Sequence, residues 1–108
     1  MNLVDEKLSE LIAAIKQSEV FEEYEETKEI LKEDPELKKQ VDEYRAKIFS
    51  LQNMEDDGHL GERIEAFAEE KLYLTSQPKV RSFLDAELAL CRLLQEVTDE
   101  IVESMNFE

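Results

Sequence analysis

The sequence predicts an all-α protein, an antiparallel helical bundle of four to five helices with a long C-terminal helix. Apolar residues recur every three or four positions along most of the chain, which is the spacing of one helix face. Only two glycines and two prolines occur in 108 residues, so loops must be few and short, because these residues build tight turns. A chain of this length is the usual size of one domain. We therefore expect residues 1–108 to form a single domain.

The first two helices are expected on either side of Ser18. A helix over about residues 3–17 is indicated by four apolar residues on one face: Leu8, Leu11, Ile12 and Ile15. The Ser18 hydroxyl can then cap the next helix by accepting a backbone N–H of its first turn. The stripe of that helix is Val20, Tyr24, Thr27 and Leu31. The two segments either bend at Ser18 or run on as one kinked helix, and the sequence leaves both open.

Asp34-Pro35 separates the second helix from the third. Proline disfavours helical geometry for the residue before it but suits the first position of a helix, where its missing N–H is not needed. Asp34 is then the N-cap, and a third helix is expected to continue to about residue 53. Its packing face is Leu37, Val41, Tyr44, Ile48 and Leu51. The break turns two helices into a hairpin that can pack.

Residues 53–62 hold both glycines and three consecutive acids, and they form the one loop of any length that we expect. A fourth helix should follow to about residue 75. Pro78 then opens the last helix, whose apolar spacing continues for some 27 residues, about 40 Å at 1.5 Å per residue.

This last helix is too long to be covered by shorter partners from its own chain, and its apolar residues spread over more than one face. Because exposed apolar stripes are costly, we expect a second chain to cover one of them. The simplest arrangement is a two-fold homodimer. The expected self-association face is Val80, Leu84, Leu88, Cys91 and Leu94.

The formal net charge of −15 argues against direct nucleic-acid binding, since neutralising phosphates requires clustered lysine and arginine. The acids are spread along the chain, which is typical of solvated helix faces. Two more specific interpretations of the acidic surface stay open. One is an acidic surface that meets a basic protein. The other is a nucleic-acid mimic that occupies the site of a DNA- or RNA-binding enzyme.

No catalytic constellation is evident, and we expect no enzyme activity and no cofactor. The single histidine, His59, lies in the acidic loop, and the single cysteine, Cys91, is expected to be a buried small hydrophobe. Nucleophilic catalysis would need a base beside the nucleophile. The carboxylates from Asp56 to Glu69 lack the second histidine of a di-metal bundle site. A carboxylate-based metal-dependent protein is retained as an alternative.

The N-terminus is acidic and has no apolar core of signal-peptide length, and no stretch approaches the roughly 18 apolar residues of a membrane span. One cysteine also excludes a disulfide within the chain. We therefore expect a cytoplasmic protein without membrane insertion.

Two stretches carry a resemblance to a known family. They are SEVFEEYEETKEILKEDPEL from Ser18 and VRSFLDAELALCRLLQEV from Val80. With the loop between them, they resemble the YlbF/YmcA family of small helical bacterial proteins over about residues 5–105, and YheA-type proteins share much of the pattern. The positions that carry it are Ser18, Tyr24, Lys28, Leu31, Asp34, Glu36 and Leu37, then Ala86-Glu87 and the apolar residues after it.

The resemblance implies an all-helical cytoplasmic protein that acts as an accessory factor in competence, sporulation or biofilm formation. Family members do so within a multiprotein complex that modulates mRNA processing, and the resemblance therefore implies protein partners. Some members hold iron–sulfur clusters on cysteines. This sequence has only Cys91 and no cysteine-rich tail, so the cluster-binding role is not carried over.

Overall fold

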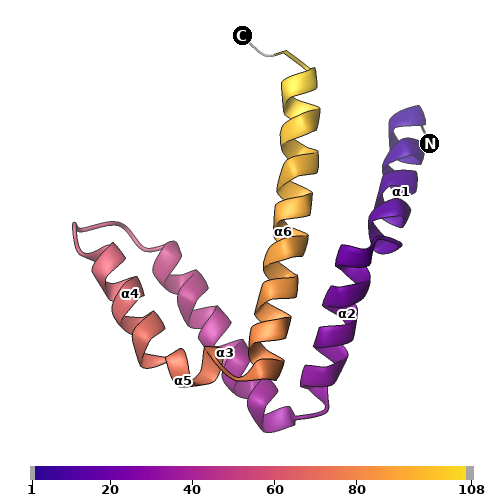
Figure 1. The fold of residues 1–108 in the computed structure, drawn as a ribbon. Helices are drawn as coiled ribbons and strands as arrows, with labels where there is room; N and C mark the ends of the chain where they lie inside the picture. The colour runs from indigo at the N-terminus through magenta and orange to yellow at the C-terminus, as the bar shows by residue number, and fades with distance from the viewer. Residues whose placement is uncertain (1, 107–108) are drawn as a thin grey trace. The chain divides into compact units, whose positions relative to one another are not determined.

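The computed structural model describes residues 2–106, and within them it contains helices and no strand. The helices are α1 Leu3–Lys16, α2 Glu19–Lys32, α3 Pro35–Gln52, α4 Leu60–Glu70, α5 Leu72–Thr75 and α6 Pro78–Ser104 (Figure 1). The all-α class and the long C-terminal helix are therefore confirmed. None of the described helices combines the length and the apolar composition that a membrane span requires.

The helices divide into two compact units, which are described separately. Unit 1 comprises the chain up to Lys28 together with the chain from Phe83 onward, and unit 2 comprises Glu29–Ser82. Unit 1 thus contains α1, most of α2 and most of α6, while unit 2 contains α3, α4 and α5. That the whole chain forms one domain stays a prediction.

The expected helix ends at Ser18 and Asp34 are confirmed by their hydrogen bonds. The Ser18 hydroxyl accepts from the Phe21 N–H at 3.2 Å, so the chain ends α1 and restarts as α2. The Asp34 carboxylate accepts from the Leu37 N–H at 3.2 Å, and Pro35 occupies the first turn of α3. A further cap was not anticipated: the Asn2 side chain accepts from the Asp5 N–H at 2.8 Å at the start of α1.

The expected count of four to five helices is exceeded because the fourth segment is broken. One helix was expected to run to about residue 75, but α4 ends at Glu70 and α5 begins at Leu72. Lys71, with φ −97° and ψ 10°, stands between them. Neither glycine nor proline occurs at this point, so the usual sequence signals of a helix break are missing. The short α5 carries Leu74, which is only 2% exposed.

Unit 2 holds most of the buried apolar side chains. Its core consists of Leu31, Leu37, Val41, Leu51, Leu74 and Val80. α3 and α4 pack against each other (Figure 1). The rings of Tyr44 and Phe67 stack between these two helices, with centroids 5.7 Å apart and planes 13° apart. The predicted packing face of α3 is thus used within its own unit.

Unit 1 has a smaller set of buried side chains. Phe83 and Ala86, both on α6, are its buried apolar residues. The Phe83 ring meets the Tyr24 ring of α2 at a centroid distance of 5.8 Å, and Tyr24 in turn lies 6.2 Å from Phe21. None of the residues of α1 is buried.

Candidate protein-interaction surface

The largest set of exposed apolar side chains in unit 1 lies on α6 beyond the aromatic contact. Leu88 is 49% exposed and Leu94 is 44% exposed, and between them Cys91 is also exposed. Ile101, Val102 and Met105 are exposed further along. This part of the helix keeps its apolar pattern in a region where its own chain does not bury it.

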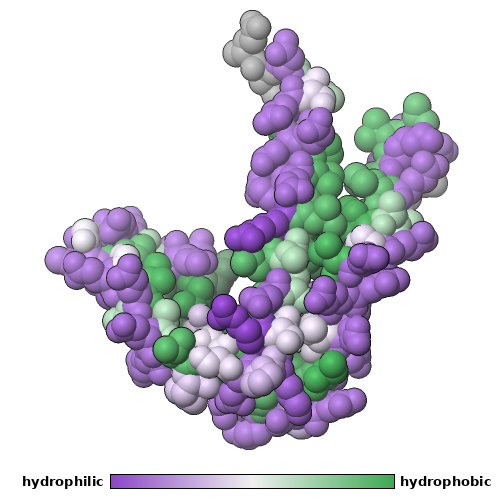
Figure 2. All heavy atoms as spheres, in the orientation of Figure 1, coloured by the Kyte–Doolittle hydropathy of each residue, from purple (hydrophilic) through white to green (hydrophobic). Residues whose placement is uncertain are grey.

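α1 presents a second set of exposed apolar side chains. They are Leu3, Val4, Leu8 and Ile12, whereas Leu11 and Ile15 are half-buried. Figure 2 shows hydrophobic side chains along the side of α6 that looks toward α1 and α2. Contiguous exposed apolar side chains are a feature of contact sites on small proteins, which makes these residues the candidate surface. We call these exposed residues of α1 and α6 the unit 1 apolar surface.

The expected self-association face divides into covered and open residues. Val80 is 0% exposed and belongs to the core of unit 2, so it offers no surface. Leu84 is half-buried, while Leu88, Cys91 and Leu94 are exposed. Whether these residues contact a second chain stays a prediction.

Cys91 was expected to be buried, and this expectation is wrong. Its side chain is exposed on α6. The apolar spacing that placed it on a packing face is real, but no segment in the described part of the chain covers that face enough to bury it. The sequence reports which residues share a face, and it does not report whether that face is occupied.

His59 lies exposed in the loop before α4, as expected, with its Nδ1 3.5 Å from a carboxylate oxygen of Glu62. In the same loop, Asp57 accepts two hydrogen bonds from the Arg63 guanidinium, at 3.0 and 3.1 Å, and one from the His59 N–H. Arg63 and this backbone donor lower the pKa of Asp57. Gly58 adopts φ +96°, a left-handed conformation that glycine reaches without strain.

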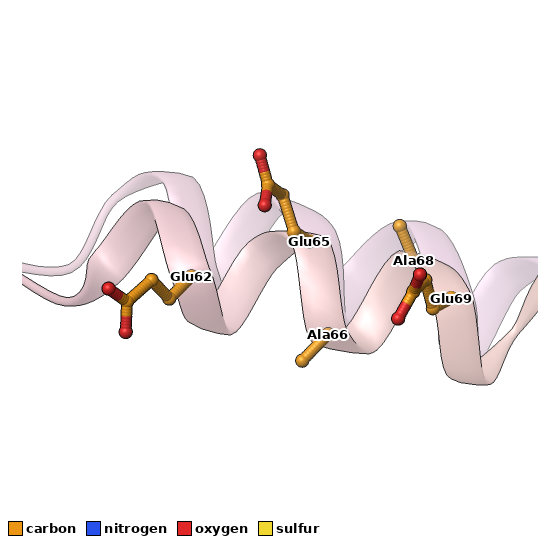
Figure 3. A pocket seen from close by; sticks show the side chains of 5 residues that line it. All are labelled: Glu62, Glu65, Ala66, Ala68 and Glu69. Carbon is orange, nitrogen blue, oxygen red and sulfur yellow. The ribbon is translucent and has the colours of Figure 1, made fainter.

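The acidic stretch considered for metal binding runs from the loop before α4 along the exposed side of that helix. A shallow hollow of about 420 Å³ is lined by Glu62, Glu65, Ala66, Ala68 and Glu69 of α4. Figure 3 shows the Glu62 and Glu65 carboxylates pointing in different directions. Within residues 2–106, no three His, Cys, Asp or Glu side chains are grouped so that they could hold a metal ion. The hollow therefore offers no converging donor set.

Sequence reasoning missed the exposed part of the unit 1 apolar surface on α1. The spacing of Leu8 and Ile12 identified them as one face of a helix, and that face was not assigned to a contact with another chain. A signal was present in the length of the segment. Isolated helices shorter than about 12–15 residues are marginal in water, and α1 has 14 residues, none of which is buried.

Comparison with known proteins assigns the chain to a family. The model of the family described as "Control of competence regulator ComK, YlbF/YmcA" matches residues 4–106. A UPF0342 protein of Caldicellulosiruptor bescii is 25% identical over 101 residues, which cover 92% of this chain and 85% of the relative. A UPF0342 protein of Caldicellulosiruptor saccharolyticus is 24% identical over 101 residues, covering 92% and 84%. No solved structure matches the chain.

Proposed function

The chain belongs to the YlbF/YmcA family, and we propose that it is a non-enzymatic regulatory protein that works by binding other proteins. The family is described by its control of a competence regulator, which supports an accessory regulatory role. We propose further that the protein acts in the cytoplasm, as part of a complex that modulates mRNA processing.

The observation that carries this proposal is the unit 1 apolar surface. Apolar side chains exposed in succession on α1 and on the distal part of α6 form the kind of surface that marks a protein–protein contact. The groups that would suggest chemistry are few. His59 is in a loop and Cys91 is on α6, and these are the only residues of their types in the chain.

We propose that a second copy of the chain is one partner at this surface. The double substitution Leu88→Asp with Leu94→Asp places charge at two exposed apolar positions of α6. Ala89→Asp adds one such charge at an exposed position on another side of the helix and is the control. In light scattering, the wild type and the control should be dimeric at micromolar concentration and the double variant monomeric. A monomeric wild type would refute self-association.

Deletion of the gene in the native host tests the regulatory role. Sequencing of RNA 5′ ends should then show that some sites are cleaved less often in the deletion strain than in the wild-type strain. The wild type and Ala89→Asp should restore these sites, while the Leu88→Asp and Leu94→Asp double variant should not. Unchanged RNA ends in the deletion strain would contradict a role in mRNA processing. Restoration by the double variant would contradict action through this surface.

A further inference from the structure

Five residues in the middle of α6, of which Leu84 is half-buried and the other four are exposed, have a symmetric spacing. Leu84, Leu88, Cys91, Leu94 and Thr98 follow one another at intervals of four, three, three and four residues. Cys91 is also the midpoint of the helix, which runs from Pro78 to Ser104 over 27 residues. A two-fold rotation about an axis through Cys91 therefore exchanges position 84 with 98 and position 88 with 94, so the set is superposed on itself.

A two-fold interface requires such self-complementarity, because the same patch of both copies must meet. With the axis at Cys91, an antiparallel pair of α6 helices places Leu88 of one copy opposite Leu94 of the other. These two residues are exposed to nearly the same degree, 49% and 44%. Leu84 would lie opposite Thr98 in the same way.

The charges of α6 favour the antiparallel direction. Within residues 84–98, the part of the helix before Cys91 carries Asp85 and Glu87, a net charge of −2. The part after Cys91 carries Arg92 and Glu96, which cancel. An antiparallel pair sets the part of charge −2 against the neutral part, whereas a parallel pair sets the two parts of charge −2 together. The helix dipoles also favour the antiparallel pair, because the positive end of each helix then lies beside the negative end of the other.

The side of α6 that would receive the second copy differs from the side used within unit 1. Five of the buried or half-buried positions of α6 in unit 1 form a separate row, namely Phe83, Ala86, Leu90, Leu93 and Val97, while the half-buried Leu84 and Glu87 lie on the side of the symmetric set. At 3.6 residues per turn, the centre of this row lies roughly 120° around the helix from the centre of the symmetric set. A helix with two separate apolar sides is typical of a four-helix bundle, in which each helix has two neighbours.

We infer that two copies of this chain pair through α6, antiparallel, with the two-fold axis at Cys91. This inference rests on the proposed self-association and specifies its direction and register. The contact extends over residues 84–98, about 21 Å of helix. It does not reach Val80, which is buried in unit 2. The exposed apolar residues of α1 are then available to the second copy at the margin of the same bundle.

Thiol cross-linking tests the register without any substitution, because Cys91 is the only cysteine. A short bismaleimide should join two native chains into a covalent dimer, and Cys91→Ala should abolish the product. Leu88→Asp should also abolish it, which excludes random collision as its source. A chain that is dimeric in light scattering but is not cross-linked through Cys91 would overturn the register. A monomeric chain would instead overturn the proposed self-association itself.

Two further variants test the direction of the pair. On the Cys91→Ala background, Leu84→Cys and Thr98→Cys chains are purified separately and then mixed. In the antiparallel pair, the mixture should give roughly tenfold more cross-linked dimer than either chain alone, because only unlike thiols are held close together. Like thiols are separated by 14 positions, about 21 Å along the helix. Efficient cross-linking of Thr98→Cys with itself would show a parallel pair and overturn the inference.

Discussion

The two units use the same kind of apolar spacing with opposite results. In unit 2, the stripe that includes Leu37 and Val41 is buried. In unit 1, the corresponding stripes of α1 and of distal α6 stay open, and α1 buries no residue at all. Helical periodicity therefore identifies a surface that is able to pack. Burial requires a neighbouring segment as well, which α3 and α4 supply to each other in unit 2.

The largest expected effect comes from opening the core of unit 2. Leu74 is 2% exposed, while Leu72, two residues earlier on α5, is 58% exposed. Leu74→Ala should lower the free energy of unfolding by about 2–5 kcal/mol, since it leaves a cavity. Leu72→Ala should stay within about 0.5 kcal/mol. Urea unfolding followed by circular dichroism measures both. Equal effects would mean that α5 does not anchor this core.

The contrast between Val80 and Leu88 shows what could be predicted from the sequence and what could not. Both were assigned to one face of the last helix, and both do share its apolar pattern. Val80 is buried and Leu88 is exposed, because burial depends on which distant segments cover each turn. No local pattern contains that information.

The helix ends at Ser18 and Asp34 could be predicted because capping is a local interaction. In each case the side chain bonds an N–H three residues later, and all the atoms involved belong to one turn. The break at Lys71 could not be predicted, since it lacks a glycine or proline. Of the candidate surface, the residues of α6 were anticipated, and the exposure of α1 was not.

The second prediction concerns α1, the helix of unit 1 that has no buried residue. At low protein concentration the backbone amides of α1 should exchange rapidly with deuterium, because the helix has no buried residue. At concentrations where the chain self-associates, exchange should slow roughly tenfold or more. α3 should show no such dependence and serves as the internal control. Slow exchange of α1 at every concentration would show that this helix is stable without a second chain.

A smaller effect is expected from the cap that starts α3. Asp34→Ala removes the carboxylate that accepts from the Leu37 N–H, and it should cost about 1 kcal/mol of unfolding free energy. Asp34→Asn retains an acceptor oxygen and should recover most of the loss. Urea unfolding again provides the measurement. An alanine variant as stable as the wild type would show that Pro35 alone defines this helix start.

The smallest effect is expected at the exposed ion pair of the loop before α4. The Arg63 guanidinium and the His59 N–H lower the pKa of the Asp57 carboxyl in the folded state. A lowered pKa means that the stability contributed by the pair is present above the unfolded-state pKa and is lost as the pH falls through the folded-state pKa. Arg63→Gln should raise the Asp57 pKa toward its ordinary value in an NMR titration of the carboxyl carbon.

Because the Asp57 carboxylate is exposed to solvent, salt should weaken its attraction to Arg63. Repeating the titration in high salt should therefore narrow the difference between the wild type and Arg63→Gln, while the hydrogen bond from the His59 N–H keeps the pKa of both somewhat low. Glu62→Gln, in the next turn, leaves both donors to Asp57 in place and is the matched control. A wild-type pKa unaffected by Arg63→Gln would show that the loop backbone, with Gly58 in its left-handed conformation, holds the carboxylate without the ion pair.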